Sequence, residues 1–320
     1  MPTVVVTGAT GFIGSHVCPE LARNGWTVKA LSRKRTELTA PGVEPVIIED
    51  LLNGHLARLF EGADAVVHLA GLAHVNRASQ TSVDGFERGN VTATGRVVSA
   101  AAEVGVRRFV HLSSASIFGN ETSFIGINDE TLPQPSTPYA RSKLSAEQVV
   151  LHARASNGLS TVILRPPMVF GPRMKGNPAR LFSFVRNRLP MPVLARTRRS
   201  MIYVGNLAAG IVAAVNSDAP TSLPYIVADE PALSIPELVD LVSRAFDLKP
   251  KTVSFPPSVL SAVTRISRFL HVGSGISLLL DRLSQSFVVD GRRFRRDFEY
   301  QAPYSIAQGI QLTADWYRRT

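Results

Sequence analysis

Val4-Val5-Val6-Thr7-Gly8-Ala9-Thr10-Gly11-Phe12-Ile13-Gly14 stands near the start of the chain. The β-branched run predicts a buried strand, and the apolar spacing from Phe12 to Leu21 predicts a helix. Between the two, glycines at positions 8, 11 and 14 allow a tight turn, a close approach of the backbone to a pyrophosphate, and close packing of the helix on the sheet. The free N–H groups at the start of such a helix bind phosphate. Because these glycines lie between a strand and a helix, the stretch indicates nucleotide binding.

Strands and helices alternate through the first half of the chain. The further predicted strands are Trp26–Leu31, Val43–Ile48, Ala63–Leu69, Arg107–Leu112 and Ser160–Leu164, and the further predicted helices are His55–Phe60, Val83–Val104 and Pro138–Ser156. Strands separated by helices of this length form a parallel sheet with right-handed crossovers. The sequence therefore predicts an α/β fold, a Rossmann doubly wound parallel sheet.

The alternation also suggests two domains. We expect residues 1–166 to form the nucleotide-binding Rossmann domain. A strand and a helix predicted within Met201–Ser217 return the chain to it, so residues 201–224 join this domain. From Pro166 onward the pattern loosens and proline becomes frequent. Residues 167–200 and 225–320 are therefore predicted to form mainly a smaller C-terminal substrate domain.

The charge balance narrows the class of partner. The 320 residues include 35 Lys and Arg but 25 Asp and Glu, so the net charge is +10. Arginines cluster at 196–199 and 292–296, but the sequence contains no zinc-ligand spacing, helix-turn-helix pattern or aromatic-interleaved basic strand. Anionic, phosphorylated substrates explain the same excess of positive charge. We therefore expect no nucleic-acid partner, and no metal site, because His, Cys and carboxylates lack metal-ligand spacing.

Few residues bear on location and redox state. Cys18 is the single cysteine and falls within the first helix, where a core role is expected, so no disulfide framework exists and a reducing compartment is indicated. Met1-Pro2 leads directly into the first strand without the basic and apolar regions of a signal peptide. No uncharged apolar run reaches the about 18 residues of a membrane span. We expect a cytoplasmic protein without stable membrane insertion.

His68 and His111 fall within strands, and we expect both to be hydrogen-bonded interior residues.

The end of the second strand bears on the choice of cofactor. An acidic residue there would accept hydrogen bonds from the ribose hydroxyls of NAD. This chain has Ser32-Arg33 instead. A guanidinium pairs with a 2′-phosphate, so NADP(H) is favoured over NAD(H), and a solvated basic turn is the alternative interpretation of the same residues. Asp50 and Leu51, just past the third strand, are placed to contact adenine through a carboxylate and an apolar side chain.

A second group of residues indicates proton chemistry. Tyr139 and Lys143 are four residues apart in a predicted helix and so share one face. We expect the Lys143 ammonium to lower the pKa of the Tyr139 phenol by stabilising its ionised form. A phenol of this kind exchanges a proton with a carbinol or carbonyl. Ser113 and Ser114 follow the strand that ends at Leu112, at the edge where open α/β sheets bind their ligands.

The remaining motifs extend over the first two-thirds of the chain. They are Asp50-Leu51, His68-Leu69-Ala70-Gly71, Asn90, Ser113-Ser114-Ala115-Ser116-Ile117-Phe118-Gly119, Tyr139–Lys143, Leu164-Arg165-Pro166-Pro167, and Arg199 with Tyr203-Val204-Gly205-Asn206-Leu207. Together with the glycine turn they make the chain resemble an extended short-chain dehydrogenase/reductase of the nucleotide-sugar epimerase/dehydratase family.

The resemblance implies a set of site residues. The catalytic residues would be Ser114, Tyr139 and Lys143, with Ser113 or Ser116 as the fallback serine. The cofactor-binding residues would be Gly8, Thr10, Gly11, Phe12, Ile13, Gly14, Ser32, Arg33, Asp50, Leu51, Leu69, Ala70, Gly71, Asn90, Tyr139, Lys143 and Pro166. The substrate-binding residues would be Ser114, Ser116, Asn177, Arg199 and Arg282. The family's usual asparagine after the Leu164-Arg165 strand is Met168 here, which leaves some sugar or phosphate contacts open.

The resemblance also implies a reaction. The chain is similar to enzymes that reduce the 4-keto group of UDP-2-acetamido-2,6-dideoxy-hexos-4-ulose for surface polysaccharide synthesis. The alternative is a UDP-glucose or UDP-N-acetylglucosamine 4-epimerase. A dehydratase is disfavoured because no acidic pair follows Ser114. A non-catalytic NADP-binding regulator on the same fold would not need the tyrosine-lysine pair. The family commonly dimerises through the helices predicted at Val83–Val104 and Pro138–Ser156, so a homodimer is expected.

Overall fold

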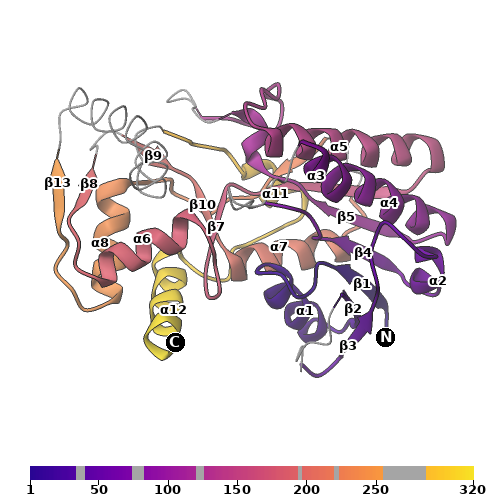
Figure 1. Cartoon of the computed structure of the whole chain (residues 1–320), viewed down its shortest axis with the longest axis horizontal. Helices are drawn as coiled ribbons and strands as arrows, with labels where there is room; N and C mark the ends of the chain where they lie inside the picture. Colours follow the sequence, from indigo (N-terminus) through magenta and orange to yellow (C-terminus); the bar gives the residue numbers. More distant parts are fainter. Residues whose placement is uncertain (34–39, 74–82, 120–125, 194–196, 220–222, 255–285) are drawn as a thin grey trace.

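Two parts of the molecule lie side by side along its longest axis (Figure 1). The computed structural model describes residues 1–33, 40–73, 83–119, 126–193, 197–219, 223–254 and 286–320, without the side chains of residues 177, 192 and 193. The larger part is a sheet with helices on both faces and contains the N-terminus. The smaller part ends at the C-terminus and is built mainly from α6 (Asn177–Arg186), α8 (Ile235–Ala245) and α12 (Ile306–Arg319).

The main sheet has seven strands in the order β11-β6-β5-β4-β1-β2-β3. They are β1 (Thr3–Thr7), β2 (Thr27–Ser32), β3 (Val43–Ile47), β4 (Ala65–His68), β5 (Arg108–Leu112), β6 (Ser160–Arg165) and β11 (Tyr225–Ile226). Every neighbouring pair is parallel. The predicted doubly wound α/β fold is confirmed. Chain order reverses between β1 and β4, and a ligand crevice is expected at the carboxyl ends of these strands.

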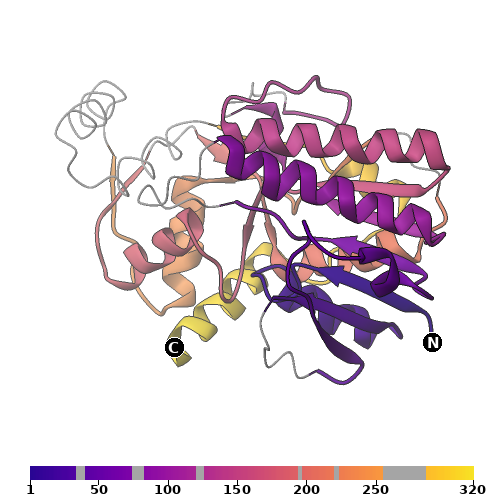
Figure 2. The ribbon, with the colours of Figure 1, turned by 45° about the vertical axis from the view of Figure 1, so that its right-hand side comes forward.

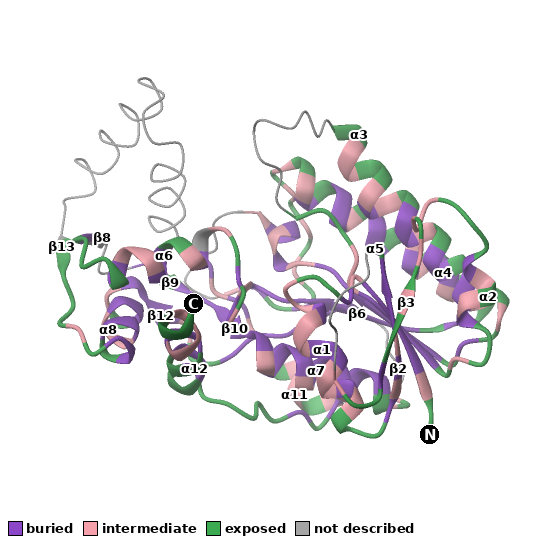
Figure 3. Ribbon diagram, turned by 60° about the horizontal axis from the view of Figure 1, so that its bottom comes forward, coloured by how far each residue is buried: buried purple, intermediate pink, exposed green. Residues whose placement is uncertain are grey.

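Alternating side chains bury both faces of the sheet. Val4 and Val6 of β1 pack with α1 (Gly14–Arg23) and α7 (Val204–Asn216), where Cys18 is buried as predicted. Val5 faces the other way, against α2 (Leu56–Phe60), α4 (Ala93–Glu103) and α5 (Pro138–Asn157). Figure 2 shows α4 and α5 side by side on this second face, and Figure 3 shows the strands buried between the two layers. This pattern is typical of a parallel sheet covered on both sides.

The long helix predicted over Val83–Val104 forms, with one irregular segment. It consists of α3 (Val83–Phe86), the π-helical segment η1 (Glu87–Thr92) and α4. Gly89 in η1 makes room for Leu72, because a Cβ at Gly89 would lie 2.7 Å from Leu72 Cδ1. Asn90 in the same segment binds the Leu72 backbone. The wide turn thus brings two residues against the loop that follows β4, and such turns are frequent at functional sites.

The seventh strand was not predicted. Tyr225–Ile226 pair with Leu164 and Arg165 and extend the sheet beyond β6. α11 (Arg292–Asp297) packs beside them, with Phe294 and Phe298 against the Tyr225 ring in the main core. A strand of two residues is too short to show a period in the sequence. These segments, placed with the substrate domain from sequence, lie on the Rossmann sheet.

The smaller part has its own apolar core. Three short strand pairs support it: β7 (Met168–Phe170) with β10 (Met201–Tyr203), β8 (Met191–Val193) with β13 (Thr252–Ser254), and β9 (Arg198–Arg199) with β12 (Leu233–Ser234). α8 and α12 both begin with a capping box, at Ser234 and Ser305, and contribute apolar residues to this core. No helix within the described ranges is long and apolar enough to cross a membrane.

Candidate active site

The glycine turn after β1 and the start of α1 form the candidate cofactor cradle, at the carboxyl edge of the sheet. Gly8 has φ +69°, and a Cβ there would lie 2.6 Å from the Ala70 backbone nitrogen. A Cβ at Gly14 would collide with the Gly8 carbonyl oxygen. In the part of the chain that the structure describes, no side chain caps the N-terminus of α1. Uncapped helix N–H groups behind a glycine-rich turn fit a pyrophosphate.

A chain of hydrogen bonds holds the loop that follows β4. The Ala70 N–H donates to Thr7 Oγ1 at 3.3 Å, and the Thr7 hydroxyl lies 2.7 Å from His68 Nδ1. His68 Nε2 lies 3.0 Å from Thr94 Oγ1, which donates to the Asn90 carbonyl at 2.5 Å. Because the Thr94 proton is used, the network assigns the ring proton of His68 to Nε2. Burial lowers the pKa of His68 to about 3, so the ring is neutral. The predicted hydrogen-bonded interior role of His68 is confirmed.

Asn90 clamps the same loop from the η1 side. Its Oδ1 accepts from the Leu72 N–H at 2.7 Å, and its Nδ2 donates to the Leu72 carbonyl at 3.1 Å. Nδ2 also donates to Ser142 Oγ at 2.8 Å. The side chain is 1% exposed. A Cβ at Gly71 would lie 3.0 Å from Asn90 Oδ1 and 4.0 Å from Lys143 Nζ, so this loop passes directly beside the predicted site. A positioning role of this kind was not foreseen from the sequence.

For His111 the predicted interior position is confirmed, but the predicted hydrogen bonding is wrong. Its ring is fully buried, and neither nitrogen has a hydrogen-bond partner among the described residues. It stacks on the His68 ring with centroids 5.4 Å apart. Burial, with the nearby Lys143 charge, lowers the pKa of His111 well below its ordinary value. The sequence places His111 on a strand correctly but cannot reveal which of its neighbours are polar.

Ser114 and Tyr139 come together from different elements. Ser114 ends β5 and caps the short helix η2 (Ala115–Phe118), with the Ser116 N–H 3.2 Å from its Oγ. Tyr139 lies in the first turn of α5, whose start is fixed by Thr137 accepting from the Ala140 N–H at 3.1 Å. The Tyr139 hydroxyl is hydrogen-bonded to Ser114. The pairing that the sequence predicts is thus present in the geometry.

Lys143 lies one turn further along α5. Its Nζ donates to the Leu112 carbonyl at 2.7 Å, and burial lowers its pKa to about 8. The expectation that the pKa of Tyr139 is lowered overall is wrong for this structure. Burial raises the pKa of Tyr139, and the hydrogen bond from Ser114 is what opposes that rise. Desolvation of the phenol is therefore the larger effect, and it keeps the hydroxyl protonated.

The three serines of this segment have different surroundings. The Ser113 hydroxyl donates to Glu147 inside the protein. The Ser116 hydroxyl is buried and has no partner within the residues described. Ser114 alone is bonded to Tyr139. The fallback role of Ser113 is therefore less favoured, and the free Ser116 hydroxyl fits a polar ligand beside Ser114.

The predicted adenosine end lies beyond β2 and β3. Ser32 is buried at the end of β2, its carbonyl accepts from the Ile48 N–H at 2.9 Å, and Arg33 beside it is exposed. Asp50 Oδ1 accepts from the Leu52 N–H at 3.0 Å, which orders the turn after β3. Arg33 is thus an exposed cation at the carboxyl end of β2.

The substrate candidates differ in what the structure describes. Arg199 is 9% exposed in β9, opposite Leu233, and forms a bridge with Phe287. Asn177 begins α6, but its side chain lies outside the description, and Arg282 lies outside the described residues altogether. No cluster of three or more His, Cys, Asp or Glu able to hold a metal occurs over the described ranges.

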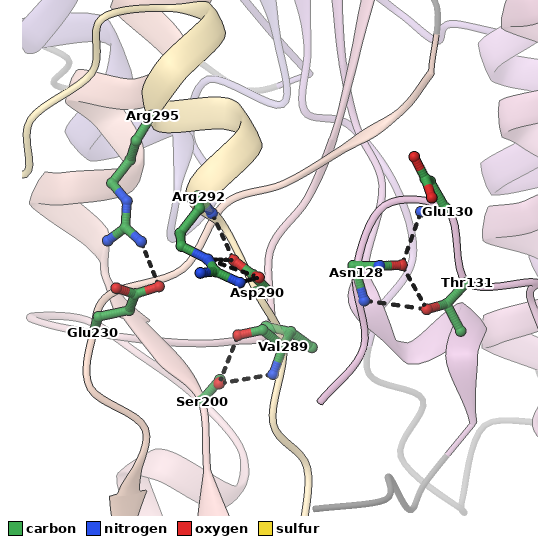
Figure 4. Close-up of polar contacts among 9 residues, drawn as sticks. All are labelled: Asn128, Glu130, Thr131, Ser200, Glu230, Val289, Asp290, Arg292 and Arg295. Carbon is green, nitrogen blue, oxygen red and sulfur yellow. Dashed lines mark hydrogen bonds and ion pairs between the residues drawn. The ribbon is translucent and has the colours of Figure 1, made fainter. Parts of the chain in front are cut away.

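The C-terminal arginine cluster is ion-paired. Figure 4 shows Arg292 on Asp290 and Arg295 on Glu230, beside the Ser200–Val289 contact. The segment carrying Val289 and Asp290 also bridges to Ile127. Arg292 thus holds Asp290, which is near it in the chain, and Arg295 ties α11 to Glu230.

The chain is similar in sequence and fold to known proteins. A profile of the NAD dependent epimerase/dehydratase family matches residues 4–227. UDP-glucose 4-epimerase of Vibrio cholerae is 26% identical, over 98% of this chain and 94% of its own. Ceramide reductase of Caulobacter vibrioides (strain NA1000 / CB15N) is 26% identical, over 98% and 94%. The solved structure of MoeE5 in complex with UDP-glucose and NAD is 26% identical, covers 99% of both chains and has a TM-score of 0.78.

Proposed function

Because the chain belongs to the NAD dependent epimerase/dehydratase family of enzymes, we propose that it is an oxidoreductase acting at C4 of a UDP-sugar. The substrate we favour is UDP-2-acetamido-2,6-dideoxy-hexos-4-ulose, whose reduction would serve surface polysaccharide synthesis. The observation that carries the proposal is the contact between Ser114 and Tyr139 at the carboxyl edge of the sheet, with Lys143 one turn away.

The proposed cofactor is NADP(H), with NAD(H) as the alternative. The glycine turn and the uncapped start of α1 would hold the pyrophosphate. Exposed Arg33 supports a 2′-phosphate, whereas the NAD in the MoeE5 complex supports the alternative. The backbone at Ala70 and Gly71 would run alongside the ribose, and Lys143 would bind the ribose hydroxyls. When bound, the nicotinamide supplies the hydride for reduction of the sugar ketone.

In this proposal, side chains of the protein supply the proton that the C4 oxygen takes up. Tyr139 is buried enough to remain protonated, so its hydroxyl is a proton donor to the C4 oxygen as that oxygen gains charge. Ser114 Oγ would hydrogen-bond the same oxygen and fix its position. Lys143, bound to the Leu112 carbonyl, would stabilise the phenolate that remains.

Epimerisation is the second candidate function. The relative from Vibrio cholerae is named a UDP-glucose 4-epimerase, and an epimerase would use the same three residues in both directions. Loss of water is less favoured, since Ala115 and Ser116 follow Ser114 where a dehydratase would need acidic groups. A non-catalytic regulator is opposed by the Ser114–Tyr139 contact, which cofactor binding alone does not require.

One assay separates these possibilities. Purified protein is incubated with NADPH and, in turn, the 4-keto UDP-sugar, UDP-glucose and UDP-N-acetylglucosamine. A reductase consumes NADPH in proportion to a reduced product from the 4-keto sugar. An epimerase first oxidises C4, so the parent UDP-sugars are also incubated with NAD⁺ or NADP⁺ in place of NADPH, and an epimerase inverts them without net reduction of that cofactor. Cofactor binding without conversion of any of the three would support the regulator and contradict the proposed reaction.

A further inference from the structure

A buried carboxylate lies one helical turn beyond Lys143. Glu147 is 1% exposed and shares the inward face of α5 with Lys143 and Tyr139. Its Oε1 accepts from Ser113 Oγ and, at 3.0 Å, from Arg165 Nε. Its Oε2 accepts from Arg165 Nη2 at 2.6 Å. Three donors, including a bidentate guanidinium, thus contact the two oxygens of this carboxylate.

Glu147 connects three elements at the candidate site, namely α5, β5 and β6. Arg165 ends β6 and lies over the Phe118 ring of η2, with its guanidinium carbon 5.1 Å from the ring centroid. Ser113 directly precedes Ser114, and its N–H donates to the Leu164 carbonyl at 2.8 Å. The carboxylate therefore connects α5 to the ends of β5 and β6, on the side of the site away from the glycine turn.

The charges in this interior do not cancel. Lys143 and Arg165 are cationic, and Glu147 is the anion that faces them. From β4 and β5, His68 and His111 face Lys143, and both are neutral because burial and the Lys143 charge lower their pKa values. Tyr139, on the same helix face, is protonated. Glu147 is thus the anion that the described residues provide for Lys143, and it raises the Lys143 pKa against the effect of burial.

We propose that Glu147 is a positioning residue that keeps Lys143 charged and holds Ser113 so that Ser114 meets Tyr139. Without the Glu147 charge, an ammonium in this interior would have only neutral or cationic side chains around it and would lose its proton more readily. The inference deepens the proposed function, because a neutral Lys143 could not stabilise the Tyr139 phenolate. The charge state of Lys143 is measurable without any substrate.

The experiment is a pH titration of the lysine side chains by NMR. The chain has six lysines, so protein labelled with carbon-13 at the lysine ε-carbon gives few signals, and Lys143→Arg identifies the one of interest. In the wild-type protein we expect this signal to titrate at about 8. In Glu147→Gln, which keeps the shape but removes the charge, we expect the midpoint to fall by roughly one unit.

Two variants separate charge from shape. Glu147→Asp keeps the charge with a shorter side chain, and its Lys143 midpoint should stay closer to that of wild type than the Gln variant does. Glu103→Gln, at the exposed end of α4, removes an equal charge far from the site and should change nothing. An unchanged Lys143 midpoint in Glu147→Gln would overturn the proposal.

A second variant tests the proposal if Glu147→Gln does not fold. If Glu147→Gln alone does not fold, because Arg165 is left buried without its partner, the neutral pair Glu147→Gln with Arg165→Met is titrated instead. The Lys143 midpoint should again be lower than in wild type, and an equal or higher value would overturn the proposal. Where turnover is measurable, the alkaline limb of the pH–rate profile should move to lower pH with it. Failure of every UDP-sugar to react would count against the proposed function and leave the titration result standing.

Discussion

Tyr139 is the residue on which the proposed chemistry depends most. Its hydroxyl contacts Ser114 and is kept protonated by burial. Tyr139→Phe removes the proton but keeps the ring that packs beside Phe86, 6.1 Å between centroids. We expect turnover to fall about a hundred- to ten-thousand-fold while cofactor affinity stays within a few-fold. Steady-state kinetics with a fluorescence titration of NADPH checks both. Wild-type turnover in the variant would contradict the assignment.

His111 makes a separate prediction at the same scale. Its two ring nitrogens are buried without described partners, so an apolar side chain of similar size should be better tolerated. We expect His111→Leu to raise the free energy of unfolding by about 1 kcal/mol. His68→Leu is the matched control and should lower it, because Thr7 and Thr94 would lose their partner. Urea denaturation measures both, and a destabilised His111→Leu would contradict this reasoning.

The His111 effect should depend on pH with a defined sign. A histidine in the unfolded chain titrates near about 6.5, whereas burial lowers the pKa of His111 well below that in the folded protein. Below about pH 6.5 the unfolded chain therefore binds the additional proton, and stability is lost as pH falls. Asp129 and Asp229 act oppositely, because burial raises their pKa values to about 6. The informative quantity is the difference between variant and wild type. That difference should grow as pH falls below about 6.5, and a pH-independent difference would contradict the argument.

At the scale of elements, the turn between β1 and α1 makes the sharpest prediction. Gly8→Ala places a Cβ 2.6 Å from the Ala70 backbone, so the loop after β4 must move away from the cofactor cradle. Gly62→Ala is the matched control, because Gly62 has a similar φ of +71° and nothing within 4 Å of its Cβ. Both variants share the backbone strain of about 1 kcal/mol.

The two glycine variants should therefore differ in binding rather than in strain. We expect Gly8→Ala to weaken NADPH binding at least ten-fold and Gly62→Ala to leave it unchanged, as measured by isothermal titration calorimetry. Equal affinities in the two variants would mean that the cradle does not hold the pyrophosphate.

Elements were predicted well where one local signal determines them. The β-branched runs and glycine spacing placed β1, α1 and the strands through β6 within one to three residues of the observed bounds. The helix starting at Pro138 was clear because Thr137 caps it and Pro138 suits the first turn. β11 escaped prediction because its two residues are ordered by pairing with β6 and by α11, which comes from far along the chain.

The candidate site residues could be named from the sequence, but the relative sizes of the effects that shift their pKa values could not. Spacing correctly placed Tyr139 and Lys143 on one helix face, and motif order placed Ser114 beside them. The direction of the Tyr139 pKa shift was missed, because the degree of burial follows from tertiary packing. Glu147 carried a faint signal, four residues after Lys143, but its partners Arg165 and Ser113 come from other strands.

At the scale of the whole molecule, we propose that the chain dimerises through α4 and α5. These helices lie together on one face of the sheet. Arg96, Arg141 and Gln148 on them are exposed. We expect sedimentation equilibrium to give twice the chain mass of 34.6 kDa. Arg141→Glu with Gln148→Glu should reduce the mass to that of one chain, because like charges would meet across a two-fold interface. A wild-type mass of one chain would contradict the proposal.

The central claim is that the larger part of the molecule holds a nicotinamide cofactor, with Tyr139 within proton reach of a sugar carbonyl at C4. The most direct measurement uses NADPH deuterated at the transferable position together with the 4-keto UDP-sugar. We predict that the wild-type protein forms a reduced product with deuterium at C4. We predict that Tyr139→Phe forms this product far more slowly. A reduced product without deuterium at C4, or no product at all despite cofactor binding, would contradict the account.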